Sequence, residues 1–301
     1  MSAWVLITIA AAFLQNARSA LQKHLRGRLS GAGATYVRFV YGAPYALAFA
    51  AVATALHGGG PAAPEGWAPV FWSATTAGGV AQILATFALI RSFDYTSFAV
   101  GTALSKTEPI QAALFGALLL AEIPSWGVIG AIGLGVLGVA LATVSPRATG
   151  RLALSPQAAA WGLGSAALFA ISAVSYRAAS LSLGDDPAWL RATCTLAAAT
   201  VLQTLIMGAW MRWRSRGDLA AVWAAWRPGL LVGAAGAAAS ACWFTAFTLE
   251  PAAHVRTLAN IELVFTFAAS VLVFRERPTL REVVGVLLTM AGVTLLLVAT
   301  L

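Results

Sequence analysis

Charged side chains are scarce in this sequence: they make up 10% of its 301 residues, whereas 59% are hydrophobic and the mean hydropathy is +0.80. An ordinary soluble domain carries about 25% charged residues. A soluble fold with so few charges could not keep its surface hydrated, so most of the surface must face lipid. The composition therefore predicts an integral membrane protein.

Residues that build metal, redox and catalytic sites are also rare. The two cysteines, Cys194 and Cys242, lie in separate apolar runs, and the three histidines, His24, His57 and His254, are far apart. No His-Glu-x-x-His, Gly-x-Ser-x-Gly or Gly-x-x-x-x-Gly-Lys-Ser/Thr pattern occurs. These absences argue against an intramembrane enzyme and an ATP-driven pump, and no metal or other cofactor is expected.

Long apolar runs alternate with short polar breaks along the whole chain. A helix needs about 20 apolar residues to cross the hydrocarbon core of a bilayer. No connection is long enough to hold a soluble domain, so the sequence predicts an all-α membrane protein of about ten transmembrane helices. The predicted spans are 3–21, 35–56, 70–90, 98–120, 126–144, 156–179, 188–211, 229–249, 253–274 and 280–300.

Basic residues concentrate in the connections that follow the odd-numbered spans, and acidic residues in the others. The formal net charge of +8 therefore indicates topology rather than a nucleic-acid partner. Because basic connections are retained in the cytoplasm, both chain termini are predicted to lie outside, in the periplasm of a bacterial inner membrane.

An internal repeat relates the two halves of the sequence. Segments 108–122 and 262–276 each begin and end with glutamate, 14 residues apart (122−108 and 276−262). The same shift of 154 residues (262−108) carries Gly138 onto Gly292. The sequence therefore predicts one membrane domain made of two related parts.

The predicted halves, 1–148 and 149–301, each hold five spans. An odd number of spans forces the second half to enter the bilayer from the opposite face, which makes the repeat inverted. Inverted repeats are typical of secondary transporters, in which two equivalent halves exchange inward-open and outward-open states. We therefore expect a transporter working by alternating access through a central cavity.

Several motifs resemble the drug/metabolite transporter superfamily, and within it the ten-helix EamA-type members. They are the break at Glu122-Ile123-Pro124 before the glycine-dense segment 127–138, and the break at Glu276-Arg277-Pro278 before 283–293. Segment 15–23 is similar to the first helix of the family, and Arg38 to an arginine of its second helix. The overall pattern is most similar to YddG-type exporters of aromatic and other amino acids, which implies export or exchange of metabolites.

Ionisable residues within spans cost at least ~2.5 kcal/mol at the bilayer centre, so they are functional candidates. The deepest are Lys106, Glu108 and Glu262, and the repeat maps Lys106 onto Asn260 and Glu108 onto Glu262. Two hypotheses stand for Lys106: it pairs with a glutamate across the pseudo-twofold axis, or it offers its charge to a substrate carboxylate. Either glutamate could couple transport to protons or serve only as a structural ion pair.

Five arginines inside the predicted spans are further candidates. Long side chains near helix ends can reach water at little cost, so structural roles are expected for three of the five, Arg38, Arg177 and Arg191. The other two are Arg18 and Arg256.

Polar and aromatic residues at mid-depth form a candidate substrate cavity. Amides, hydroxyls, aromatic walls and one cation would suit an amphipathic amino acid. The alternative for each polar residue is an interhelical hydrogen bond, worth about 0.6 kcal/mol. The candidates are Gln15, Asn16, Gln82, Lys106, Ser172, Ser175, Tyr176, Trp243 and Asn260.

The cargo stays open at this stage. A nucleotide sugar or sugar phosphate would favour several deep basic groups, and a cationic drug an unpaired deep carboxylate, with or without proton coupling. Expected partners are a small-molecule substrate and the bilayer. Ten helices suffice to enclose a transport path within one chain, so a monomer would be enough for the predicted transport.

Overall fold

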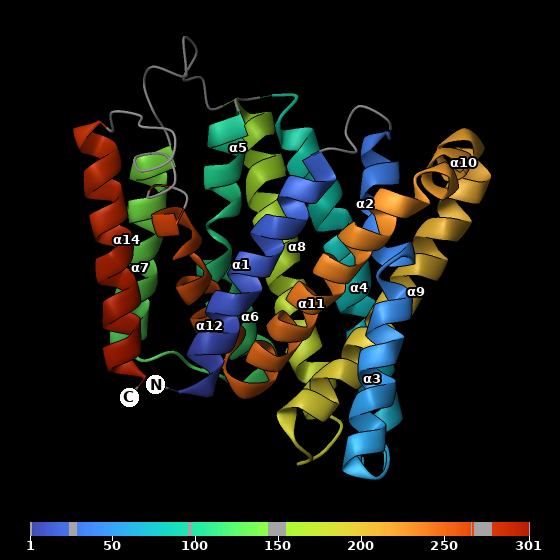
Figure 1. Ribbon diagram of the computed structural model, residues 1–301. Helices are drawn as coiled ribbons and strands as arrows, with labels where there is room; N and C mark the ends of the chain where they lie inside the picture. Colours follow the sequence, from blue (N-terminus) through green and yellow to red (C-terminus); the bar gives the residue numbers. More distant parts are fainter. Residues whose placement is uncertain are drawn as a thin grey trace. The chain divides into compact units, whose positions relative to one another are not determined.

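Every regular element that the structure describes is an α-helix (Figure 1). The computed structural model describes residues 2–23, 29–95, 98–143, 155–265, 267 and 279–300. Its helices are α1 (Ala3–Lys23), α2 (Gly31–Val40), α3 (Ala43–His57), α4 (Trp67–Ser92), α5 (Phe98–Ser105), α6 (Glu108–Leu120), α7 (Trp126–Thr143), α8 (Pro156–Leu181), α9 (Ala188–Arg214), α10 (Arg216–Ala224), α11 (Trp226–Leu249), α12 (Ala252–Ala259) and α14 (Leu280–Ala299).

Seven helical segments in these ranges are long and apolar enough to cross a membrane. They are the α2–α3 segment and helices α4, α7, α8, α9, α11 and α14, while α1 has a shorter apolar stretch, Ala3–Arg18. The prediction of an all-α membrane protein is confirmed. The short helix α10 falls in a connection for which no helix was predicted, and the break at Glu276-Arg277-Pro278 lies outside the described residues.

Three spans that were predicted as continuous are interrupted. Residues 41–42 separate α2 from α3, residues 106–107 separate α5 from α6, and residues 260–261 follow α12. Pro44 and Pro109 each occupy the second position after a break, where proline cannot donate the backbone hydrogen bond that would continue the preceding helix. The second and third breaks are repeat equivalents, since they are also 154 residues apart (260−106).

The chain forms two compact units, each drawn from both predicted halves. The first comprises Met1–Val80 and Ser175–Leu249, and the second comprises Ala81–Val174 and Glu250–Leu301. We call them unit 1 and unit 2. The division falls inside α4 and α8, whose helices run through it without a break.

Unit 1 packs around α11, one face of which is lined by glycines. A methyl group added at Gly233 would meet the backbone carbonyl of Tyr41, and one added at Gly229 would lie 2.6 Å from the Tyr41 ring. The Tyr41 hydroxyl in turn donates to the backbone carbonyl of Val222 at 3.0 Å. Residues 41–42, which separate α2 from α3, therefore pack directly against the backbone of α11.

Unit 2 contains a helix pair, α7 and α14, in backbone contact. A methyl group added at Gly138 would lie 2.6 Å from the carbonyl oxygen of Gly285, and one added at Gly292 would lie 2.7 Å from the amide nitrogen of Gly135. These approaches require glycine on both helices. Gly135 and Gly138 of the glycine-dense segment 127–138 thus allow close contact between the two helices.

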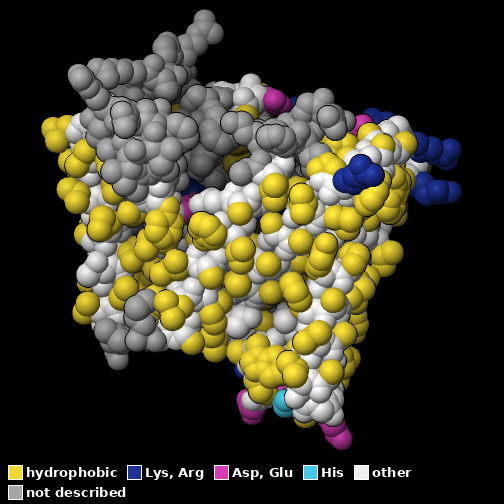
Figure 2. Space-filling model, viewed as in Figure 1, with side chains coloured by type: hydrophobic (Ala, Val, Ile, Leu, Met, Phe, Trp, Pro, Cys, Tyr) yellow, Lys and Arg dark blue, Asp and Glu magenta, His cyan; other side chains and the backbone are white. Residues whose placement is uncertain are grey.

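Apolar side chains cover most of the described surface in Figure 2, as expected of a surface that faces lipid. Leu118, Trp126 and Val298 are 71%, 87% and 65% exposed. Within unit 1, basic side chains gather at the end formed by α9 and α10, where Asp218 of α10 also lies, and acidic side chains with a histidine gather at the opposite end, near the end of α3 (Figure 2). This pattern is typical of a membrane protein with one cytoplasmic face.

Candidate functional site

Two ion pairs connect the interrupted helices of unit 2. Lys106, in the break after α5, pairs with Glu262, the first residue after the break at 260–261. Glu108, the first residue of α6, pairs with Arg256 of α12, whose Nε lies 2.7 Å from its Oε1. The four side chains are between 13% and 28% exposed, so both pairs are largely shielded from solvent.

The two pairs form a reciprocal network. The first half of the chain supplies Lys106 and Glu108, and the second half supplies Arg256 and Glu262. Of the two hypotheses for Lys106, pairing with a glutamate describes the contact that is present. Arg256 was recognised as an in-span cation but not as a member of the site. The repeat places threonine at the position equivalent to Arg256, residue 102 (256−154), so the internal alignment gave no signal for its role.

The break after α12 also presents a buried amide. Asn260 is 2% exposed, and its Nδ2 has no hydrogen-bond partner in the described part of the chain. A methyl group added at Gly135 of α7 would lie 3.6 Å from this nitrogen, so the absence of a side chain there leaves Asn260 its space. The other candidates of unit 2 are Ser172, which is buried in α8, and Gln82, which is half-buried in α4.

In unit 1, the structure joins two of the predicted cavity residues. The indole Nε1 of Trp243 in α11 donates to Oε1 of Gln15 in α1 at 3.1 Å. The Trp243 ring also stacks on Phe247, with centroids 6.0 Å apart and planes 21° from parallel. Asn16, by contrast, is exposed. An amide and an indole thus meet inside an apolar helix pair, where each fixes the orientation of the other.

Tyr176 lies in a second polar cluster of unit 1. Its ring packs against Phe244 with centroids 4.3 Å apart, and its hydroxyl accepts a hydrogen bond from Gln203 Nε2 at 3.2 Å. The same amide nitrogen lies 3.3 Å from the carbonyl of Gly79. Ser175 is buried beside Tyr176. Gln203 was not predicted as a site residue, although a glutamine in an apolar run is the same signal that singled out Gln15.

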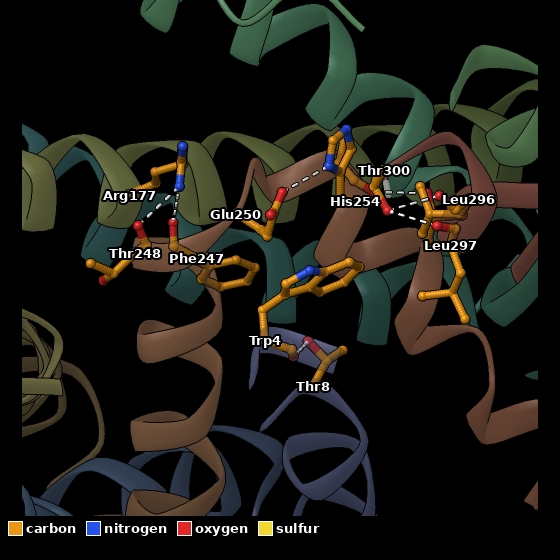
Figure 3. A network of polar contacts seen from close by, with 12 residues as sticks. Trp4, Thr8, Arg177, Phe247, Thr248, Glu250, His254, Leu296, Leu297 and Thr300 are labelled. Atoms are coloured by element: carbon orange, nitrogen blue, oxygen red, sulfur yellow. Dashed lines mark hydrogen bonds and ion pairs between the residues drawn. The ribbon is translucent and has the colours of Figure 1, made fainter. Parts of the chain in front are cut away.

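Two of the five arginines close helix ends. Arg177 donates through one guanidinium nitrogen to the carbonyls of Phe247 (2.6 Å) and Thr248 (3.2 Å) at the end of α11 (Figure 3). Arg191 donates to the carbonyl of Gly184, 2.6 Å away, after the end of α8. Arg177 therefore satisfies carbonyls that the end of α11 leaves without intrahelical partners, whereas Arg191 holds the connection after α8.

The candidate residues divide between the units. Lys106 and Glu262 meet in unit 2, and Gln15 and Trp243 meet in unit 1. One cavity shared by both sets stays a prediction.

The model of the EamA-like transporter family matches the chain twice, over residues 2–144 and 157–298. The chain belongs to this family. The two-repeat transporter fold is therefore shown, and the protein is a multi-pass membrane transporter of the drug/metabolite type; members of the family are transporters rather than enzymes. A crystal structure of another protein superposes on this EamA-like transporter with a TM-score of 0.69, covering 100% of this chain and 99% of that one at 15% identity, which shows the fold alone. Comparison with curated proteins gave no significant match.

Proposed function

We propose that this EamA-like transporter exports amino acids, aromatic or other neutral ones, or closely related metabolites, as a YddG-type exporter. The observation that carries the proposal is the Gln15–Trp243 hydrogen bond, together with the stacking of Trp243 on Phe247. It places an amide and two aromatic rings on neighbouring helices of one unit. An amphipathic solute needs this combination of polar and apolar groups.

The charges of unit 2 favour a substrate without net charge over a cationic one. A carrier of cations would present a deep carboxylate that is open to the cargo. Here Glu262 is paired with Lys106, and Glu108 is paired with Arg256, so each acid already has a basic partner. A substrate that passes these groups would have to replace one partner of each ion pair that it opens. A zwitterion can replace both partners of one pair, because its ammonium can pair with the glutamate and its carboxylate with the basic side chain.

Flux measurements with purified protein in liposomes test this proposal. We expect saturable transport of radiolabelled phenylalanine and tryptophan. The variant Trp243→Ala should lose most of it, whereas Trp210→Ala, at an exposed position of α9, should retain it. Flux of a sugar phosphate or a quaternary cation in place of amino acids would overturn the proposed cargo. Comparing flux with and without a pH gradient separates a proton-coupled carrier from a facilitator.

The charge pattern also supports an orientation. We propose a bacterial inner-membrane protein with both termini outside, because the basic end of unit 1 would then face the cytoplasm. Fusions of a periplasm-specific reporter to each terminus should be active, and silence at both would reverse the topology. We further propose that the monomer is sufficient, which light scattering of the purified protein combined with flux measurements would test.

A further inference from the structure

The membrane-spanning helices of unit 1 contain basic residues but no acidic ones. Helices α1, α2, α3, α9 and α11 include no Asp or Glu. The acids of this unit lie elsewhere: Glu65, Asp185 and Asp186 in connections, and Asp218 in α10. Two of these acids have partners within unit 1: Asp186 pairs with His57 at 3.1 Å, and Asp218 accepts a hydrogen bond from the Ser30 hydroxyl at 2.8 Å.

Two arginines from different helices converge on one glycine of α11. A methyl group added at Gly236 would lie 3.3 Å from Cδ of Arg18 in α1 and 3.7 Å from Cγ of Arg38 in α2. Gly236 continues the glycine face that seats Tyr41, one turn further along α11. The stems of both arginines therefore cross the same bare patch of helix backbone, and their two positive charges act on one another.

Arg18 differs from the arginines that close helix ends. Its Nε is buried, and within the residues that the structure describes it has no hydrogen-bond acceptor. Arg177, by contrast, donates to a carbonyl at 2.6 Å. The Nε of Arg191 is also buried without a partner among the described residues, but its Nη1 donates to a carbonyl at 2.6 Å. A buried donor without an acceptor costs about 1–3 kcal/mol, and a neighbouring like charge adds to that cost. A bound anion would remove both penalties.

We propose that Arg18 and Arg38 form an oxyanion-binding subsite, which holds the carboxylate of the transported solute. Guanidinium groups are planar donors that match the two oxygens of a carboxylate. The inference deepens the proposed function and rests on it for the choice of carboxylate over phosphate. For Arg38, the proposal is an alternative to the structural role expected from its sequence position.

The aromatic part of the proposed site lies along the same helix pair. Gln15 precedes Arg18 by three residues on α1, so the two share a face. Trp243 follows Gly236 by seven residues on α11 (243−236), two turns and about 10 Å away. An aromatic amino acid could thus place its carboxylate at the arginines and its ring toward the indole.

Thermal unfolding of the purified full-length protein in detergent tests the subsite directly. The probes are benzoate, inorganic phosphate and benzylamine at constant ionic strength. We expect benzoate to raise the Tm of the wild type, and benzylamine to leave it unchanged. Arg18→Gln and Arg38→Gln should each abolish the benzoate shift, whereas Arg212→Gln, at the basic end of α9, should keep it.

A second readout separates ligand binding from a structural role. Without any anion, Arg18→Gln should have a Tm equal to or above that of the wild type, because it removes a like charge and a buried donor. A structural arginine would give a lower Tm. Should the glutamine variant fail to fold, Arg18→Lys keeps the positive charge without the planar guanidinium group. It should need at least tenfold more benzoate to reach half of the maximal rise in Tm.

Each outcome bears on the inference. The absence of a shift with both benzoate and phosphate, or a shift that survives in both glutamine variants, overturns it. A phosphate shift without a benzoate shift, lost in both variants, keeps the oxyanion subsite but changes the cargo to a phosphate ester. Absent amino-acid flux with an arginine-dependent benzoate shift sinks only the proposed function, and amino-acid flux with an arginine-independent shift sinks only this inference.

Discussion

Replacing Gly138 with alanine should destabilise unit 2, although alanine is the better helix former. A methyl group at Gly138 would lie 2.5 Å from both the amide nitrogen and Oγ1 of Thr289, and 2.6 Å from the carbonyl oxygen of Gly285. Two of these three atoms belong to the backbone of α14, which cannot rotate away as a side chain could. Helices α7 and α14 would have to separate.

The two opposing effects have known sizes. Alanine gains about 0.8–1 kcal/mol over glycine within a helix. Overpacking a tight contact costs about 1–3 kcal/mol, and parting the helices forfeits dispersion contacts along their length. Because the obstruction is backbone, we take the upper part of this range, so the free energy of unfolding should fall by about 1–2 kcal/mol net.

A matched control lies in the same helix. Gly133 has no heavy atom within 4 Å of the position where a methyl group would be added. Gly133→Ala should therefore be neutral or slightly stabilising. Unfolding by heat or by denaturing detergent would measure both variants. If Gly138→Ala proved as stable as Gly133→Ala, the close approach of α7 and α14 would be refuted.

The polar contacts lead to three further predictions. Lys106→Met should lower the free energy of unfolding by about 3–5 kcal/mol, because it leaves the Glu262 carboxylate buried without its partner. Adding Glu262→Leu should restore most of that loss in the same unfolding assay, and a double variant worse than Lys106→Met would count against the pair. Arg177→Gln should cost about 1.5–3 kcal/mol by removing charged hydrogen bonds from the end of α11. Arg91→Gln, which breaks the exposed ion pair with Asp94, should change the free energy of unfolding by less than about 1 kcal/mol. A larger change would contradict the expectation that exposed ion pairs contribute less to stability than buried ones.

The class of the protein could be predicted because the constraint behind it is simple. A bilayer demands about 20 apolar residues per crossing, and the sequence supplies such runs with turn-forming residues between them. The repeat could be predicted because it keeps residue types in register, as at Gly138 and Gly292, and close packing requires glycine at both positions.

The helix interruptions could not be predicted from hydropathy, because a break does not change how apolar a span is. Pro109 carried a signal for one of them, but the break at residues 260–261 has no proline. There the turn is held by local hydrogen bonds, such as the one from the Asn260 amide to the Thr257 carbonyl at 3.2 Å. Whether such bonds replace helical ones depends on tertiary contacts.

The partners of the buried charges could not be predicted from the sequence either. Lys106 and Glu262 were recognised as deep, but Arg256 lies 148 residues from Glu108 (256−108), and no spacing rule connects them. The meeting of Arg18 and Arg38 depends on the bare backbone at Gly236, so it required three helices to be placed together.

The reciprocal ion pairs have a consequence for biogenesis. The membrane receives Lys106 and Glu108 while the ribosome has yet to make their partners, Arg256 and Glu262. At about 2.5–3.5 kcal/mol for each deep charge, the newly inserted first half is an expensive intermediate, and arrival of the second half relieves it. A chain truncated after the first half would therefore keep Lys106 and Glu108 in the membrane without Glu262 and Arg256.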